Sequence, residues 1–208
     1  MTNILSQKGS WTPVSAIILA AGTSSRMGQA KQLLPLGNST VVAQTIEHAR
    51  AAKVDEVVLV LGSSAEPIRH QLSPSLLSGV KVVVNQSYEQ GMASSLRAGL
   101  SALDPQSAAT LIILGDQPFT LPQTLDQIIQ AYRDSGAPIV IPTWQGARGN
   151  PVLLDRSVFP EALALEGDVG CRAIFGKHLE EIVNVKVEDR GVLLDIDDRE
   201  DYERLAKK

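Results

Sequence analysis

Residues 16–31 constrain the fold and the function of this chain more than any other stretch of it. They begin inside an apolar run, residues 14–19, of the kind that forms a buried strand. Small residues follow at 20–25, and after them come two cations, Arg26 and Lys31. Small residues let the backbone approach a ligand closely, and successive N–H groups with cationic side chains attract anions. The stretch therefore predicts a cradle for a polyphosphate directly after the first strand.

The spacing within this stretch excludes the two commonest phosphate loops. A Walker loop has four residues between its glycines and a Gly-Lys-Ser/Thr ending, whereas five residues separate Gly22 from Gly28 and Gln29 follows. The Gly-x-Gly-x-x-Gly fingerprint of dinucleotide-binding folds is absent from this stretch as well. A glycine-rich turn without a ligand is the alternative, but Gly, Arg, Gly and Lys at fixed offsets favour the phosphate site.

Strand-like and helix-like runs alternate along the rest of the chain. After the first strand, the expected strands are 54–61, 80–84, 110–114 and 138–141, and the expected helices are 41–52, 66–72, 92–103 and 125–132. The second part is less regular, with expected strands at 151–154, 182–187 and 192–196 and helices at 157–165, 169–175 and 199–207. The alternation predicts an α/β fold, a three-layer, doubly wound, mostly parallel sheet of Rossmann-like type.

Length and composition favour one soluble domain. The 208 residues suit a single α/β domain over 14–208, with residues 1–13 as a flexible tail, a nucleotide-binding part at 14–120 and an acceptor part at 136–200. The single cysteine excludes an intrachain disulfide, and no apolar run reaches the length of a membrane span. We expect a cytoplasmic protein that binds neither membrane nor, with its net charge of −4, nucleic acid.

Charge is distributed unevenly. No Asp or Glu precedes Glu47, whereas residues 180–203 contain ten acidic residues. A start free of acids suits an anion site. An acid-rich end suits either metal binding or a solvated terminal helix.

Carboxylates follow two apolar runs, which predicts a metal site. Asp116 comes directly after the run at 111–114, where ligands of open α/β sheets bind, and Mg²⁺ takes one or two carboxylates together with phosphate oxygens. Capping of the next helix is the alternative role for Asp116. Asp195, Asp197 and Asp198 are candidates for a second metal ligand, and capping of the last helix is the alternative there.

Three further loops carry polar groups. Gly91, Ser94 and Ser95 lie at an expected helix start, where free N–H groups and hydroxyls meet a polar ligand or merely cap the helix. Arg148 and Arg172 lie in glycine-containing loops and suit a second anion, although ordinary surface turns would also explain them.

Taken together, these motifs resemble one family over nearly all of residues 14–205. The motifs are Leu-Ala-Ala-Gly…Arg-Met-Gly…Lys, Gly-Asp-Gln-Pro, Gly-x-Arg-Gly-Asn-Pro-Val and Gly-Asp-x-Gly-x-Arg. The chain resembles the molybdenum cofactor cytidylyltransferases, within the molybdopterin nucleotidyltransferase-like group. The resemblance implies transfer of CMP from CTP to the terminal phosphate of molybdopterin, with pyrophosphate as the second product. Guanylyl-transferring relatives usually carry Gly at the place of Ala21, so Ala21 favours CTP.

The resemblance also implies roles for particular residues. Lys31, Arg26 and Asp116 are expected to be catalytic, and Asp116 and Asp197 to hold Mg²⁺ or Mn²⁺, although Asp198 stands where the family usually has Thr. Ser95 is the candidate for contacting the base. The nucleotide-binding residues are expected to be Leu19, Ala20, Ala21, Gly22, Thr23, Ser24, Arg26, Gly28, Lys31, Gly91, Ser94, Ser95, Gly115 and Asp116. The acceptor-binding residues are expected to be Gln117, Arg148, Gly149, Asn150 and Arg172.

The sequence leaves alternatives open for the function. They are a related nucleotidyltransferase that uses GTP or another phosphorylated acceptor, and a nucleotide-binding accessory protein without catalysis. The expected partners are CTP, the molybdenum cofactor, and a client molybdoenzyme or its chaperone.

Overall fold

A central sheet organises the molecule, for which the computed structural model describes residues 12–24 and 27–206. Its strands are β1 (Val14–Ala20), β4 (Glu56–Leu61), β5 (Val80–Val84), β6 (Ala109–Leu114), β7 (Ile139–Trp144), β8 (Ala147–Arg148), β9 (Val152–Asp155) and β10 (Ile182–Lys186). The strand order is β10-β7-β9-β6-β1-β4-β5, with the short β8 also paired to β7. Along that order only β9 runs antiparallel to its neighbours, β6 and β7, and every other pairing is parallel. The predicted mostly parallel α/β sheet is confirmed.

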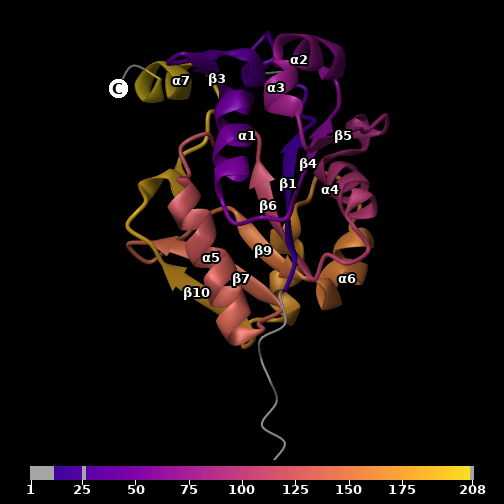
Figure 1. Cartoon of the computed structure of the whole chain (residues 1–208), viewed down its shortest axis with the longest axis vertical. Helices are drawn as coiled ribbons and strands as arrows, with labels where there is room; N and C mark the ends of the chain where they lie inside the picture. The colour runs from indigo at the N-terminus through magenta and orange to yellow at the C-terminus, as the bar shows by residue number, and fades with distance from the viewer. Residues whose placement is uncertain (1–11, 25–26, 207–208) are drawn as a thin grey trace, which may run out of the picture.

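Helices cover both faces of the sheet (Figure 1). They are α1 (Val41–Ala51), α2 (Ala65–Gln71), α3 (Pro74–Leu77), α4 (Met92–Ala102), α5 (Pro122–Ser135), α6 (Phe159–Leu163) and α7 (Arg199–Leu205). Single turns of 3₁₀ helix lie at η1 (Lys31–Leu33), η2 (Tyr88–Gln90), η3 (Arg156–Val158) and η5 (Arg190–Leu193), and a longer one at η4 (Cys171–Lys177). A separate hairpin joins β2 (Pro35–Leu36) to β3 (Ser39–Thr40).

Neighbouring residues of β1 serve two different cores. Ile18 packs in the cluster that includes Ile46 of α1 and Ile128 of α5, whereas Ile17 packs in the cluster that includes Leu96 of α4. Successive side chains of a strand point to opposite faces, so an unbroken apolar run belongs to a sheet that is covered on both sides. Burial of each such side chain stabilises the fold by about 2 kcal/mol.

Local signals fix where the helices begin and end. The Thr40 hydroxyl accepts a hydrogen bond from the Ala43 N–H at 3.4 Å and caps α1, as its place before the helix predicts. Gly136 ends α5 in the left-handed conformation with φ of 63°, and its N–H donates to the Tyr132 carbonyl.

The carboxyl ends of the central strands meet at one edge of the sheet. Ala20 of β1 is in register with Leu61 of β4, and Leu19 is in register with Leu114 of β6. The loops that leave β1, β5 and β6 consequently converge there, where open α/β sheets bind their ligands.

The predicted strand at 192–196 is wrong. Arg190–Leu193 forms the 3₁₀ turn η5, and the chain then runs along the carboxyl edge of the sheet, where Ile196 N–H donates to the Asp116 carbonyl at 3.0 Å. The Val192 carbonyl accepts a hydrogen bond from the Asn150 N–H at 2.9 Å. Val192 and Ile196 are buried against neighbouring loops and helices, so the apolar pattern reports burial without strand pairing.

The two ends of the described chain are attached to the body. Tyr202 of α7 donates its hydroxyl proton to the Pro35 carbonyl at 2.7 Å, so α7 lies beside the β2–β3 hairpin (Figure 1). Of the predicted tail, Thr12 accepts a hydrogen bond from Arg133 and Pro13 accepts one from Ala108, and residues 1–11 lie outside the described residues. None of the helices in the described part of the chain combines the length and the apolar character that a membrane span requires.

Candidate active site

A cleft of about 600 Å³ opens at the carboxyl edge of the sheet, where the three loops converge. It is lined by Leu19, Ala21, Gly22, Thr23, Ser24, Lys31, Gln32, Tyr88, Glu89, Gly91, Met92, Ser95, Leu114, Asp116, Asp168 and Asp197. Nine of the predicted nucleotide-binding residues are among them: Leu19, Ala21, Gly22, Thr23, Ser24, Lys31, Gly91, Ser95 and Asp116. Ala20, Gly28, Ser94 and Gly115 lie outside this lining, and Arg26 lies outside the described residues.

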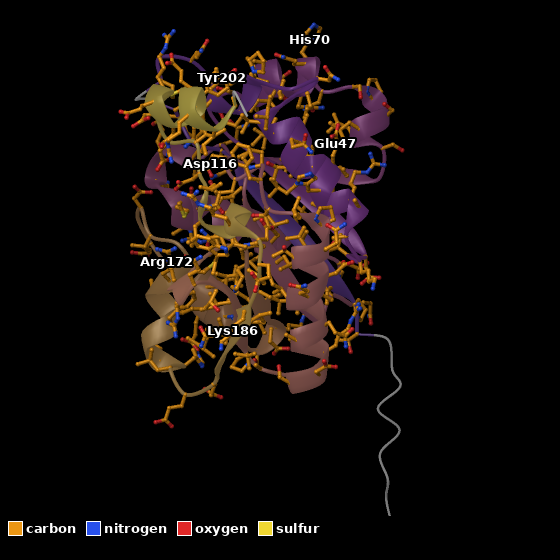
Figure 2. All side chains as sticks on the ribbon, turned by 90° about the vertical axis from the view of Figure 1, so that its left-hand side faces the viewer. Glu47, His70, Asp116, Arg172, Lys186 and Tyr202 are labelled. Carbon is orange, nitrogen blue, oxygen red and sulfur yellow. The ribbon has the colours of Figure 1, made fainter. Side chains whose placement is uncertain are left out.

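Lys31 joins two carboxylates that come from distant parts of the chain. Its Nζ is 2.7 Å from Asp116 Oδ2 and 3.0 Å from Asp197 Oδ1. The parallel strands place the loops of Lys31 and Asp116 at one edge, and the hydrogen bond from Ile196 to the Asp116 backbone brings Asp197 alongside. Figure 2 labels Asp116 in the upper part of the molecule. The structure thus brings together three of the predicted charged residues.

The two carboxylates keep Lys31 charged. Burial alone lowers the pKa of Lys31, but the negative charges and hydrogen bonds of Asp116 and Asp197 outweigh burial and raise that pKa above its ordinary value of 10.5. Burial, followed by repulsion from Asp197 and Asp116, raises the pKa of the nearby Asp195 carboxyl above its ordinary value of 3.8. Negative charge is therefore concentrated at this point of the cleft.

Asp116 has a carboxylate oxygen that no group among the described residues uses. Its Oδ1 is buried and has no hydrogen-bond partner within residues 12–24 and 27–206, although Oδ2 is paired with Lys31. A buried carboxylate oxygen without a partner is unfavourable unless a ligand or an ion satisfies it. The described lining also carries four carboxylates (Glu89, Asp116, Asp168 and Asp197) against the ammonium group of Lys31. Such a cleft accepts a polyanion only together with additional positive charge.

The loop after β1 is tied back onto η1. The Ser24 hydroxyl accepts a hydrogen bond from the Lys31 N–H and donates one to Gln32 Oε1, both at 3.1 Å. Ser24 itself has a φ of 52°, in the left-handed region that few non-glycine residues adopt. A Cβ added at Gly22 would meet no heavy atom within 4 Å, because the Gly22 backbone borders open space in the cleft.

The start of α4 is closed by a loop from the second half of the chain. The Met92 N–H donates to Asp168 Oδ1 and the Ala93 N–H donates to the Gly167 carbonyl, both at 3.2 Å. A Cβ on Gly91 would come within 2.5 Å of the Gly167 backbone, so only glycine allows this packing. The expectation of free N–H groups at this helix start is wrong, because residues 167–168 already satisfy them.

The three candidate aspartates for a second metal ligand have different surroundings. Asp198 caps α7, with Oδ1 accepting a hydrogen bond from the Asp201 N–H at 2.9 Å, as the alternative interpretation predicts. Asp197 lines the cleft and contacts Lys31, whereas Asp195 does not belong to the lining. Asp116 does not cap a helix, because α5 begins six residues further on at Pro122.

The five predicted acceptor residues lie outside the cleft lining. Arg148 Nε donates to Asn184 Oδ1 at 3.2 Å, and Gln117 is buried. Gly149 packs against Val192, where a Cβ would come within 2.4 Å of the Val192 carbonyl oxygen. Arg172 is exposed on η4 and lies below Asp116 on the same side of the view in Figure 2.

Several residues of the cleft are not among those predicted from the sequence. Gln32, Tyr88, Glu89 and Asp168 line it without having been predicted, and Asn85 donates to Ser95, which lines the cleft, and to Ser94 behind it. Glu89 and Asp168 follow no apolar run, and Gln32 follows a lysine in a polar turn. Asp168 belongs to the quoted Gly-Asp-x-Gly-x-Arg motif, and that motif is the one signal for its place beside the nucleotide loops.

A glycine-lined cleft with a lysine between two carboxylates, beyond the carboxyl ends of a mostly parallel sheet, defines the chain as an α/β protein with the nucleotidyltransferase fold. Residues 16–182 match the model of the MobA-like NTP transferase domain, and the chain belongs to that family of nucleotidyltransferases.

Known proteins are similar to this one over nearly the whole chain. The molybdenum cofactor cytidylyltransferase of Escherichia coli K12 is 28% identical over 91% of this chain and 93% of its own length. The nicotine blue oxidoreductase of Paenarthrobacter nicotinovorans is 30% identical, with 92% and 96% covered. The crystal structure of Rv0371c from Mycobacterium tuberculosis H37Rv is 35% identical and superposes with a TM-score of 0.84, covering 95% of this chain and 99% of the other. The same protein has also been crystallised in complex with manganese (33% identity, TM-score 0.81, 95% and 100% covered).

Proposed function

We propose that this chain transfers CMP from CTP to the terminal phosphate of molybdopterin, releasing pyrophosphate and forming the cytosine dinucleotide cofactor. The observation that carries the proposal is the position of Lys31 between Asp116 and Asp197, beside a glycine loop at the carboxyl edge of the sheet. The sequence motifs and the Escherichia coli relative named molybdenum cofactor cytidylyltransferase support the choice of substrates.

The donor set suits a divalent metal. The unpartnered Asp116 Oδ1 and the nearby carboxylate of Asp197 are oxygen ligands of the kind that Mg²⁺ and Mn²⁺ prefer. Among the described residues, no group of three or more His, Cys, Asp or Glu side chains forms a complete cage. Two carboxylates with phosphate oxygens and water are the usual set for Mg²⁺ at a nucleotide. When bound, the metal supplies charge neutralisation at the phosphates.

The chain contributes position and charge to the reaction. An oxygen of the acceptor phosphate attacks the α-phosphorus of CTP, the new P–O bond forms, and the bond from the α-phosphorus to the bridging oxygen breaks as pyrophosphate departs. The backbone of the loop at 20–24 holds the phosphates, and Lys31 stabilises the charge that develops on the α-phosphate. Arg26 is assigned to the same triphosphate. No protein nucleophile is required, because the attacking phosphate oxygen already carries negative charge.

The acceptor is assigned to the second half of the chain. Arg148 and Arg172 would receive its anionic groups, and Gln117, Gly149 and Asn150 would shape the passage between them and the cleft. The exposure of Arg172 on the same side of the molecule as Asp116 supports this assignment (Figure 2). The reaction would run in the cytoplasm, and the product would pass to a client molybdoenzyme or its chaperone.

Adjacent aspartates provide a matched test of the second metal ligand. Asp197→Asn is expected to lower turnover on the order of 100-fold, because it removes a charge beside Lys31 and the metal. Asp198→Asn is expected to leave turnover and melting temperature unchanged, because asparagine caps a helix as well as aspartate does. Steady-state rates and thermal melts of both variants provide the comparison, and the opposite ranking would assign the metal to Asp198.

Pyrophosphate release tests the proposed function as a whole. The rate is measured with each of the four NTPs and Mg²⁺, with and without molybdopterin, and the expected result is release that depends on both CTP and molybdopterin. Release with GTP instead of CTP, or with CTP and a different phosphorylated acceptor, would favour a related transferase. Binding of a nucleotide without any release would favour an accessory protein and contradict the proposal.

A further inference from the structure

Asn85 lies directly after β5 and holds together the loop that borders the cleft. Its side chain is buried, with 7% of the residue exposed, and its backbone N–H donates to the Leu61 carbonyl at 2.8 Å. The side-chain Nδ2 donates to Ser94 Oγ at 2.8 Å and to Ser95 Oγ at 3.0 Å. The side-chain Oδ1 accepts from the Ser87 N–H at 2.9 Å. Both protons of the amide and one acceptor position of its oxygen are therefore used.

The backbone determines which way this amide faces. The Ser87 N–H can only donate, so the atom of Asn85 that faces it must be the oxygen. The NH₂ group is consequently turned toward the two serines and supplies one proton to each hydroxyl. The orientation follows from donor and acceptor chemistry and does not depend on distinguishing oxygen from nitrogen in the side chain.

The two serines then differ in what they do with their own protons. Ser94 Oγ donates to the carbonyls of Ser87 and Gly91, at 2.9 and 2.8 Å, so its proton is used within the loop. Ser95 lines the cleft and is 5% exposed. Within the described residues, no acceptor takes the proton of Ser95 Oγ. A hydroxyl that already accepts from an amide, and whose proton is unused, meets a ligand as a hydrogen-bond donor.

We propose that Asn85 is a positioning residue that fixes Ser95 Oγ as a hydrogen-bond donor toward the nucleotide base, so that the cleft selects a base with an acceptor atom at that edge. The inference rests on the proposed function, because it requires that a nucleotide occupies this cleft. It deepens that function by assigning base selection to a buried residue that contacts no ligand itself.

The central experiment reverses the direction of the hydrogen bond between Asn85 and Ser95. The Asn85→Asp variant keeps the shape and still accepts from Ser87, but its carboxylate cannot donate, so it draws the Ser95 proton away from the cleft. The dissociation constant of CTP in the presence of Mg²⁺, measured by titration calorimetry, is expected to rise about tenfold or more. The preference for CTP over the other three NTPs is expected to fall in the same variant, while kcat changes less than KM. A purely structural role would weaken all four nucleotides alike.

Coupling between the two positions separates positioning from general damage. Ser95→Ala is expected to raise the dissociation constant for CTP to a similar degree, and the double variant Asn85→Asp/Ser95→Ala to be no worse than Ser95→Ala alone. Ser101→Ala is the matched control, because Ser101 lies on the same helix α4 at an exposed position and has no contact with Asn85 among the described residues. It is expected to change CTP affinity less than about twofold.

Each outcome decides between this inference and the proposed function. An unaltered CTP affinity in a folded Asn85→Asp chain, or strictly additive effects in the double variant, would overturn the inference while the proposed function stands. Should the Asn85→Asp chain fail to fold, equal effects of Ser101→Ala and Ser95→Ala would overturn the inference, and a loss confined to Ser95→Ala would support it. If the unaltered chain binds no nucleoside triphosphate with Mg²⁺, the proposed function fails and this inference fails with it.

Discussion

Replacing Lys31 with alanine is expected to lower the rate of pyrophosphate release by about a thousandfold, the scale seen when a charge-stabilising donor is removed from an active site. Lys31 is the one ammonium group among the described residues that line the cleft. It is 13% exposed in its side chain and lies within 3.0 Å of both carboxylates, so a neighbouring lysine cannot replace it. The rate of release from CTP at saturating Mg²⁺ and acceptor is the measurement.

A surface lysine provides the control for this variant. Lys53 is exposed in the turn after α1, and Lys53→Ala is expected to retain full turnover. Loss of Lys31 also leaves Asp116 and Asp197 facing each other, so Mg²⁺ is expected to raise the melting temperature of Lys31→Ala more than that of the unaltered chain. Near-normal turnover of Lys31→Ala, with the fold intact, would contradict the role assigned to this residue.

The raised pKa of Lys31 gives the pH dependence a definite sign. A lysine whose folded pKa exceeds its ordinary value of 10.5 stabilises the fold fully below that value and loses the contribution only as the pH rises above it. The Lys31 charge is therefore complete at neutral pH and in mildly alkaline solution. If turnover falls within that pH range, Lys31 is not the group that titrates. The same fall is therefore expected in Lys31→Arg, whose side chain stays charged.

The first half of the fold was predictable because its signals are local. Unbroken apolar runs, typical of a sheet covered on both faces, predicted the strands β1, β4, β5 and β6. The parallel pairing of these strands places the loops that follow them at one edge of the sheet. That geometry alone was enough to expect Lys31 beside Asp116, two residues 85 positions apart in the sequence. The rule that ligands bind beyond the carboxyl ends of parallel strands thus predicts a contact between distant residues, which no local sequence pattern does.

The second half was less predictable because its pairing is not local. β9 enters the sheet antiparallel between β6 and β7, and nothing in its four residues states which neighbours it takes. Val192 and Ile196 are apolar because they are buried, and apolar character alone does not separate such a segment from a strand. The choice among Asp195, Asp197 and Asp198 depends on how this segment runs along the carboxyl edge of the sheet. Backbone hydrogen bonds from Ile196 to Asp116 and from Asn150 to Val192 hold the segment there.

Asn85 illustrates a different reason why a site residue escapes sequence analysis. An asparagine after a strand is an ordinary turn residue, and its sequence context here says no more than that. Its importance comes from its burial and from three partners, at Ser87, Ser94 and Ser95, that only the folded loop brings within reach. A polar residue that only positions another polar residue belongs to no sequence motif of recognisable composition or spacing.

Asp116→Asn is expected to abolish metal-dependent turnover, a loss on the order of a thousandfold, while the fold is retained. The substitution is isosteric, but it removes the charge that pairs with Lys31 at 2.7 Å and weakens the unpartnered Oδ1 as a ligand for a cation. Asp134→Asn, at an exposed position on α5, is the control and is expected to keep full activity.

The same substitution separates an enzyme from a nucleotide-binding accessory protein, because the two roles depend differently on the metal. Binding of Mn²⁺ in the presence of CTP, followed by electron paramagnetic resonance, is expected to weaken at least tenfold in Asp116→Asn and to stay unchanged in Asp134→Asn. An accessory protein would retain its nucleotide affinity in Asp116→Asn and show no turnover even without the substitution. Full metal affinity in Asp116→Asn would instead show that the unpartnered oxygen of Asp116 faces no cation. Lys31 would then only form an ion pair that stabilises the fold. The cleft carries a surplus of negative charge, so phosphates enter it only together with a metal. Without phosphates, a lysine between two carboxylates has no catalytic task.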